Sequence, residues 1–174
     1  MPNTTANKIT VFRILLVPVF VLLLYADHRY GATAVFVLAS LSDLADGYIA
    51  RRFNQTSNFG RFIDPLADKI LVLSALCCFV EFDRMEAWCV CIVLLREFAV
   101  SGLRLLAVEQ GKVIAAAWSG KLKTACTMVC IILMLLFPNL RWVNITSVIL
   151  IVTTTALSGV EYFVKNISVL KGSE

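Results

Sequence analysis

Charged residues are scarce in this sequence. Asp, Glu, Lys and Arg make up 16% of the 174 residues, whereas 59% are hydrophobic and the mean hydropathy is +0.83. A water-soluble domain usually carries about 25% charged residues, which form its polar shell. The scarcity excludes an ordinary water-soluble fold, and the long apolar runs along the whole chain indicate that lipid is its main solvent.

Histidine is almost absent as well. The single histidine, His28, lies in a predicted loop, and no histidine is near enough to the cysteines to complete a metal site with them. All the cysteines lie within apolar runs, where we expect small membrane-buried hydrophobes. These cysteines are Cys77, Cys78, Cys89, Cys91, Cys126 and Cys130.

Signs of a composite or processed chain are also missing. The sequence has no internal repeat, low-complexity segment or domain linker, and no A-x-A-like cleavage site follows its first apolar run. We therefore expect one integral membrane domain over residues 1–174, with its first helix retained.

The apolar runs predict an all-α membrane protein with six transmembrane helices. Each run approaches the roughly 20 residues that a helix needs to cross a bilayer. The polar residues before the first run suit a short N-terminal helix that lies in the membrane interface. The predicted spans are residues 11–26, 32–51, 62–82, 87–108, 115–137 and 143–164.

Basic residues are shared unequally between the two ends of these spans. One end would carry only Arg29, Arg84 and Arg141 in its turns, and the other would carry most of the rest. Since Lys and Arg gather on the cytoplasmic side, we expect both termini and the acidic stretch described next to face the cytoplasm. The net charge of +4 is therefore interpreted as a topology signal and not as a nucleic-acid surface. The richer end carries Lys8, Arg13, Arg51, Arg52, Arg61, Lys112, Lys121, Lys123, Lys165 and Lys171.

Four aspartates stand out against this apolar background. Asp43 and Asp46 are three residues apart, and Asp64 and Asp68 are four apart, so each pair shares one face of a predicted helix. Two antiparallel helices joined by a short connection would turn the pairs toward each other. Four carboxylates in a poorly hydrated site repel one another unless a cation lies among them. Oxygen ligands favour Mg²⁺ or Mn²⁺, and two such ions can clamp a phosphoryl group during its transfer.

The residues between the aspartates suit a phosphorylated ligand. Gly47 and Gly60 remove side chains where a ligand could approach the backbone, and Arg51 could form a forked contact with a phosphate. Simpler roles exist for part of this stretch. Asp64 before Pro65 could cap a helix, and the arginines could be membrane anchors. An idle carboxylate near the end of an apolar span costs on the order of 2.5 kcal/mol or more at depth, which favours the metal site.

The spacing of these residues resembles the signature of the CDP-alcohol phosphotransferases. The matching residues are Asp43-x2-Asp46-Gly47-x2-Ala50-Arg51-x8-Gly60-x3-Asp64-x3-Asp68. The resemblance implies a six-helix membrane fold, commonly homodimeric, with its site in a cytoplasm-facing cavity. It also implies an enzyme that displaces CMP from a CDP-linked substrate with an alcohol as nucleophile.

The same resemblance implies roles for individual residues. Asp43, Asp46 and Asp64 would hold one of two Mg²⁺ (or Mn²⁺) ions, and Asp43, Asp64 and Asp68 the other. Asp68 would also act as the general base that takes the proton of the attacking hydroxyl. The residues that would contact the CDP-diacylglycerol are Asn7, Thr10, Gly47, Arg51, Ser57 and Gly60.

Further segments resemble the members of this family that join CDP-diacylglycerol with sn-glycerol 3-phosphate, giving phosphatidylglycerophosphate and CMP. These segments are residues 9–13, 67–69, 96–98, 101–104, 118–124 and 158–162. An acceptor with its own phosphate needs cations of its own. Arg104 and Lys121 are the first candidates, and Arg96 and Lys123 the second. The alternative is that the lysines are topology anchors and that Arg96 pairs with Glu97 to hold the helices together.

Other functions stay open at this stage. A cardiolipin synthase or a phosphatidylinositol-phosphate synthase would share the signature and differ in its acceptor. A carboxylate-lined divalent-cation transporter also needs acids within the membrane, although its ligands are often spread over pseudo-equivalent helices. A non-catalytic scaffold would tolerate the loss of Asp68.

Overall fold

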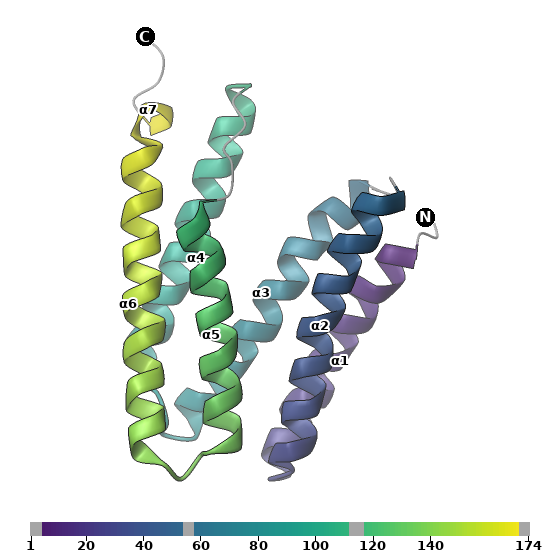
Figure 1. Ribbon diagram of the computed structural model, residues 1–174, viewed down its shortest axis with the longest axis vertical. Coiled ribbons are helices and arrows are strands. Elements are labelled where there is room, and N and C mark those ends of the chain that lie inside the picture. Colours follow the sequence, from purple (N-terminus) through teal and green to yellow (C-terminus); the bar gives the residue numbers. More distant parts are fainter. Residues whose placement is uncertain (1–4, 54–57, 112–116, 171–174) are drawn as a thin grey trace. The chain divides into compact units, whose positions relative to one another are not determined.

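The computed structural model describes residues 5–53, 58–111 and 117–170. Within these ranges it does not describe the side chains of residues 5–9, 43–53, 58–65, 68, 168 and 170. The described part of the chain is all helical and contains no strand (Figure 1). Its elements are α1 (Thr5–Tyr25), α2 (Arg29–Phe53), α3 (Asn58–Glu81), α4 (Ala87–Glu109), α5 (Trp118–Leu136), α6 (Arg141–Lys165) and the single turn α7 (Ile167–Leu170).

The long helices confirm the helical part of the sequence prediction. Each predicted span coincides with one helix from α1 to α6. The ends differ by four residues or fewer, except that α1 begins six residues before the predicted span. The prediction of a separate short N-terminal helix is wrong, because α1 runs without a break from Thr5 to Tyr25. Neither glycine nor proline interrupts its first turns, and Pro18 lies well inside the helix.

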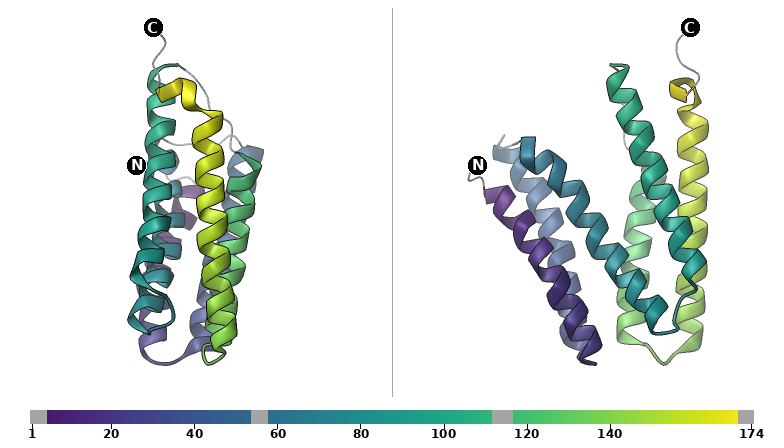
Figure 2. Two further views of the ribbon diagram at one scale, coloured as in Figure 1. Left: turned by 90° about the vertical axis from the view of Figure 1, so that its left-hand side faces the viewer. Right: turned by 180° about the vertical axis from the view of Figure 1, so that it is seen from behind.

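The helices fall into two compact units. The first comprises Met1–Phe82 together with Leu135–Phe137, and the second comprises Asp83–Met134 together with Pro138–Glu174. In the first unit, α1 packs against α2 and α3, which also contact each other; in the second, α4 packs against α6 and α7 (Figure 2).

The first unit is held together by stripes of buried side chains at helical spacing. On α3 they are Ala67, Leu71, Ala75 and Phe79, each one turn after the last. Small alanines let the neighbouring helices approach closely. The rings of Phe20 in α1 and Phe36 in α2 meet with centroids 5.7 Å apart. The stripe on α1 consists of Arg13, Val17, Phe20 and Leu24.

In the second unit, the buried face of α6 is made largely of small and polar residues. Ser147, Thr155, Ser158 and Gly159 are all buried there. Small residues at a helix interface are typical of helices that pack within membranes, where hydrophobicity alone does not bring helices together. The apolar core of this unit lies toward the C-terminal ends of α4 and α6 and consists of Val100, Leu103, Ala107, Tyr162 and Val169.

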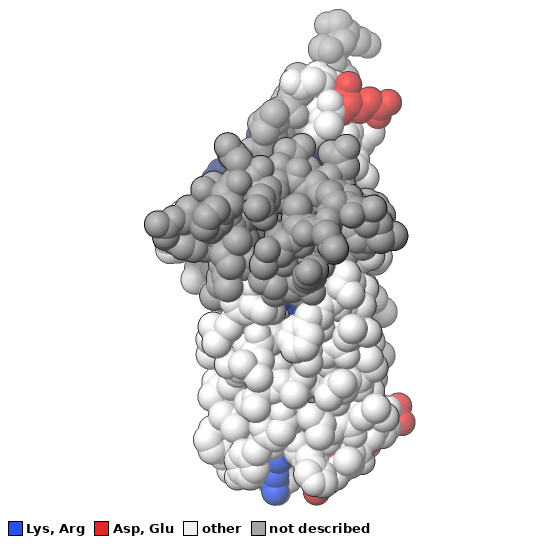
Figure 3. All heavy atoms as spheres, turned by 90° about the vertical axis from the view of Figure 1, so that its right-hand side faces the viewer, with Lys and Arg blue, Asp and Glu red and all other residues white. Residues whose placement is uncertain are grey.

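In the part of the chain that the structure describes, two helices, α5 and α6, are long and apolar enough to cross a bilayer by length and composition. Large apolar side chains are nevertheless exposed on other helices too, such as Leu22 on α1 and Leu95 on α4. Figure 3 shows one face on which the described side chains below the grey region carry almost no charge until the lower end. Exposed apolar side chains of this kind are typical of faces that contact another protein or a membrane.

Candidate functional site

The two aspartate pairs lie at similar distances from the ends of α2 and α3 that the chain connects. Asp43 lies ten residues before the end of α2, and Asp68 lies ten residues after the start of α3, so both are about 15 Å from those helix ends. Asp46 and Asp64 lie nearer to the ends, about 10 Å away along the axes. Because α2 and α3 contact each other, we expect the four positions to share one region of the unit.

The side chains of these aspartates lie outside the described residues. The same holds for the side chains of Asn7 and Arg51 and for the surroundings of Gly47 and Gly60. The backbones of these four residues are helical, while Ser57 lies outside the described residues altogether. Thr10 is described, and its side chain is buried in α1. The arrangement of the CDP-contacting residues therefore stays a prediction.

The residues that are present fit a divalent metal. Four aspartates lie on two contacting helices at similar distances from the connected helix ends, and carboxylate oxygens are donors that Mg²⁺ and Mn²⁺ prefer. Among the described side chains, no group of three or more His, Cys, Asp or Glu could hold a metal ion elsewhere. The assignment of a divalent ion to the two aspartate pairs stays a prediction, because their side chains lie outside the described residues.

Arg13 is a residue whose placement the sequence did not reveal. We counted it among the cytoplasmic anchors, but its side chain is only 1% exposed in the interior of the first unit. Its Nε donates a long hydrogen bond of 3.5 Å to Oγ of Ser42, the residue before Asp43. A buried cation therefore lies beside Ser42, the residue that precedes Asp43 in the sequence.

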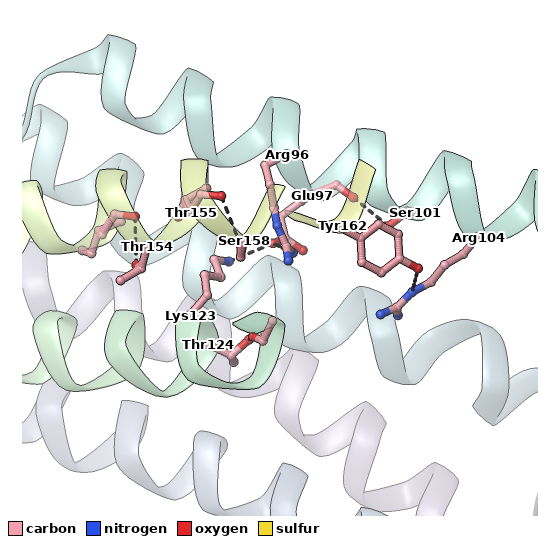
Figure 4. Close-up of polar contacts among 12 residues, drawn as sticks. Arg96, Glu97, Ser101, Arg104, Lys123, Thr124, Thr154, Thr155, Ser158 and Tyr162 are labelled. Carbon is pink, nitrogen blue, oxygen red and sulfur yellow. Dashed lines mark hydrogen bonds and ion pairs between the residues drawn. The ribbon is translucent and has the colours of Figure 1, made fainter. Parts of the chain in front are cut away.

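In the second unit, two of the four predicted phosphate-binding cations converge on one carboxylate. Oε1 of Glu97 accepts hydrogen bonds from Nη1 of Arg96 at 2.9 Å and from Nζ of Lys123 at 2.8 Å (Figure 4). Lys123 is buried, and the side chains of Arg96 and Glu97 are largely buried too. The bond between Lys123 and Glu97 links α5 to α4. This agrees with the alternative that Arg96 and Glu97 hold the helices together.

Two glycines make room for the Arg96 side chain. A Cβ atom on Gly159 of α6 would stand 3.1 Å from Cγ of Arg96, and one on Gly120 of α5 would stand 3.5 Å from its Nη2. Its Nε is buried and has no hydrogen-bond partner among the described residues. Arg96 is thus enclosed by three helices of the unit.

The other two predicted cations are exposed. Nε of Arg104 on α4 donates a hydrogen bond of 3.0 Å to the hydroxyl of Tyr162 on α6, and its Cζ lies 5.5 Å from the centroid of that ring (Figure 4). Lys121 is exposed in the first turn of α5. Neither forms an ion pair with a described residue, so their charges stay available to an anion.

Tyr162 was named in the sequence only as part of a resembling segment. A local signal for its placement exists, because it follows Thr155 and Ser158 at intervals of seven and four residues on one face of α6. A tyrosine on a buried face needs a partner for its hydroxyl. Only the folded structure identifies that partner as Arg104.

Comparison with known proteins gives one consistent result. Residues 3–158 match the family model described as CDP-alcohol phosphatidyltransferase. The chain is 40% identical to a Bacillus subtilis (strain 168) protein named CDP-diacylglycerol–glycerol-3-phosphate 3-phosphatidyltransferase, over 96% of this chain and 97% of that protein. Proteins of the same name from Escherichia coli (strain K12) and Shigella flexneri serotype 5b (strain 8401) are each 36% identical to it, over 86% of both chains.

Proposed function

Because this chain belongs to the CDP-alcohol phosphatidyltransferase family, we propose that it transfers the phosphatidyl group of CDP-diacylglycerol to sn-glycerol 3-phosphate. The products are phosphatidylglycerophosphate and CMP, which makes the protein a transferase of phospholipid biosynthesis. The observation that carries this proposal is the 40% identity to a relative with that name, over nearly the full length of both chains.

In the proposed reaction, the 1-hydroxyl of glycerol 3-phosphate attacks the lipid-side phosphorus of CDP-diacylglycerol. The new phosphorus–oxygen bond forms as the bond to the CMP oxygen breaks, and CMP leaves with that electron pair. Asp68 takes the proton of the attacking hydroxyl as general base. Two divalent ions would be held by Asp43, Asp46, Asp64 and Asp68. When bound, these ions supply positive charge that offsets the negative charge developing on the phosphates.

The remaining residues would bind and orient the two substrates. Gly47, Arg51, Ser57 and Gly60 are proposed to contact the CDP part, together with Asn7 and Thr10 of α1. For the acceptor phosphate we propose Arg104 and Lys121 first, because both are exposed and free of ion pairs with the described residues. Arg96 and Lys123 are second, because Glu97 already offsets part of their charge.

We further propose that α1 to α6 all cross the membrane, with both termini and the site facing the cytoplasm. Exposed tryptophans support this placement, because Trp88, Trp118 and Trp142 each lie in the first turn of a helix. Tryptophan is enriched where a membrane helix meets the headgroups. A site at that boundary keeps the acyl chains in lipid while the polar acceptor arrives from water. A homodimer is proposed by analogy with the family.

The test is a product assay on the purified protein in detergent. Radiolabelled glycerol 3-phosphate and CDP-diacylglycerol should give labelled phosphatidylglycerophosphate with Mg²⁺ or Mn²⁺, and none after chelation of the metal. Phosphatidylglycerol and inositol phosphate should not serve as acceptors. CMP release that required either of them would contradict the proposed acceptor, and metal flux into proteoliposomes without CMP release would support a transporter.

A further inference from the structure

Arg104 is held in one orientation by a residue from another helix. Its Nε donates to the Tyr162 hydroxyl at 3.0 Å, and among the described residues Tyr162 is its only polar or ring partner. A long exposed side chain would otherwise sample many rotamers in water. The bond to Tyr162 therefore fixes the guanidinium relative to the second unit.

Tyr162 is suited to act as a fixed point. Its side chain is only 2% exposed and packs in the core with Val100, Leu103 and Ala107 of α4. A ring that is enclosed by the core cannot follow the motion of a surface residue. Its hydroxyl thus presents one acceptor at a constant position beside α4.

The geometry of this contact determines which part of Arg104 is left for a ligand. A guanidinium has five N–H donors, one on Nε and four on the two terminal nitrogens. Tyr162 occupies the Nε donor, so the Nη1–Nη2 edge stays open. This edge can donate two parallel hydrogen bonds to two oxygens of one phosphate. A lysine offers no such planar fork.

A purely structural account explains less of the arrangement. Arg96 and Lys123 are buried and paired with Glu97, as expected for cations that hold helices together. Arg104 is exposed and pairs with a neutral hydroxyl, so its full positive charge remains. Holding an uncompensated cation still at the surface serves the binding of an anion.

We propose that Tyr162 is a positioning residue that orients Arg104 so that its terminal nitrogens bind the phosphate of glycerol 3-phosphate end-on. This inference rests on the proposed function, because that function supplies the phosphorylated acceptor. Tyr162 itself touches no substrate; it acts through Arg104. Its loss therefore weakens the binding of the acceptor and leaves the binding of CDP-diacylglycerol unchanged.

The test compares Tyr162→Phe with the parent protein by steady-state kinetics. Phenylalanine keeps the buried ring and removes only the hydroxyl. The KM for glycerol 3-phosphate should rise about five-fold, as expected for one lost hydrogen bond. The kcat and the KM for CDP-diacylglycerol should stay within about two-fold, since neither depends on that bond. The inhibition constant of inorganic phosphate, used as a competitor of the acceptor, should rise by the same factor.

Two further variants separate positioning from structure. In an Arg104→Lys protein, Tyr162→Phe should have no additional effect on the KM, because the pair acts as one unit. Tyr30→Phe is the matched control, since the Tyr30 ring lies near Arg29, with its centroid 5.9 Å from the guanidinium carbon, and Tyr30 has no place in the proposed site. That variant should leave both KM values unchanged.

The possible failures can be told apart. If Tyr162→Phe changes kcat and both KM values together, or lowers the Tm without a selective change in KM, Tyr162 is structural and the inference is wrong. If Arg104→Lys leaves the KM for glycerol 3-phosphate unchanged, Arg104 does not bind its phosphate, although the transfer reaction stands. If the parent protein forms no labelled phosphatidylglycerophosphate, the proposed function itself fails.

Discussion

Gly159 of α6 lies directly against Arg96 of α4. A Cβ atom at residue 159 would stand 3.1 Å from Cγ of Arg96, which is closer than ordinary van der Waals contact. The same arginine donates to Glu97, which also accepts from Lys123 of α5. A single missing side chain on α6 therefore leaves space for an ion-pair network that joins α4 and α5.

The first prediction is that Gly159→Ala destabilises the protein. The added methyl group would push the Arg96 stem away, and overpacking of this kind typically costs about 1–3 kcal/mol. The Tm in detergent should fall accordingly. Gly102→Ala is the matched control, because nothing lies within 4 Å of a Cβ atom built there. An equal or smaller fall for Gly159→Ala than for Gly102→Ala would contradict this account.

The second prediction concerns the carboxylate at the centre of that network. Glu97→Gln leaves Lys123, whose side chain is 6% exposed, without its negative partner. Removing one member of a buried ion pair typically costs about 3–5 kcal/mol, because the other charge stays buried. The Tm of the variant should therefore fall strongly, and Lys123→Met in the same protein should restore much of it.

A matched control exists on α6, where Glu161 and Lys165 form an ion pair one turn apart. The Lys165 side chain is well exposed, so water can replace its partner. Glu161→Gln should therefore change the Tm little. Similar decreases in the Tm for Glu97→Gln and Glu161→Gln would show that burial does not determine how much these ion pairs stabilise the protein.

The helices themselves could be predicted from the sequence. Apolar runs of membrane length and the charges between them mark where each helix begins and ends, and α1 to α6 follow those runs. The polar start of the first run was misleading, because residues 5–10 continue α1. Helical residues within a turn of an apolar run extend that helix more readily than they form a separate one.

The partners of the cations could not be predicted in the same way. Arg96, Glu97 and Lys123 were all visible as polar residues in apolar runs, but their pairing depends on how α4 packs against α5. The contact of Arg104 with Tyr162 joins residues 58 positions apart and depends in the same way on α4 and α6. Spacing along one helix carries no information about such packing.

The third prediction follows from the buried position of Arg13. A buried cation costs several kcal/mol unless negative groups compensate it. The Arg13 side chain is buried and donates to Ser42, the residue before Asp43. We expect the neighbouring aspartate pair to share this charge. Arg13→Gln should therefore lower the Tm more without Mg²⁺ than with it, since the divalent ion can replace the lost positive charge.

Arg29→Gln, at the opposite end of α2 from the aspartates, is the control for this experiment. Its Tm should respond to Mg²⁺ as that of the parent protein does. If Arg13→Gln lowers the Tm equally with and without Mg²⁺, Arg13 stabilises the helices independently of the carboxylates.

The last prediction separates two aspartates of the same metal site by their proposed roles. Asp68→Asn removes the proposed general base, a loss that typically costs about 10²–10⁴-fold in rate, while three carboxylates stay to hold the divalent ions. Turnover should be abolished or nearly so, and much of the CDP-diacylglycerol binding should persist. Asp43→Asn removes a residue proposed to bind both ions, so binding and turnover should fall together.

Equilibrium binding of CDP-diacylglycerol and the rate of CMP release, measured on the same preparations, would distinguish these outcomes. Asp27→Asn provides the control, because Asp27 is exposed at the opposite end of α2 from Asp43 and Asp46. If Asp68→Asn and Asp43→Asn both reduce binding and CMP release mildly and to the same degree, Asp68 is not the general base and Asp43 is not a ligand shared by both ions. Since a carboxylate and its amide are nearly identical in shape, any difference between the two variants must come from charge and proton transfer, which are the properties that the proposed mechanism uses.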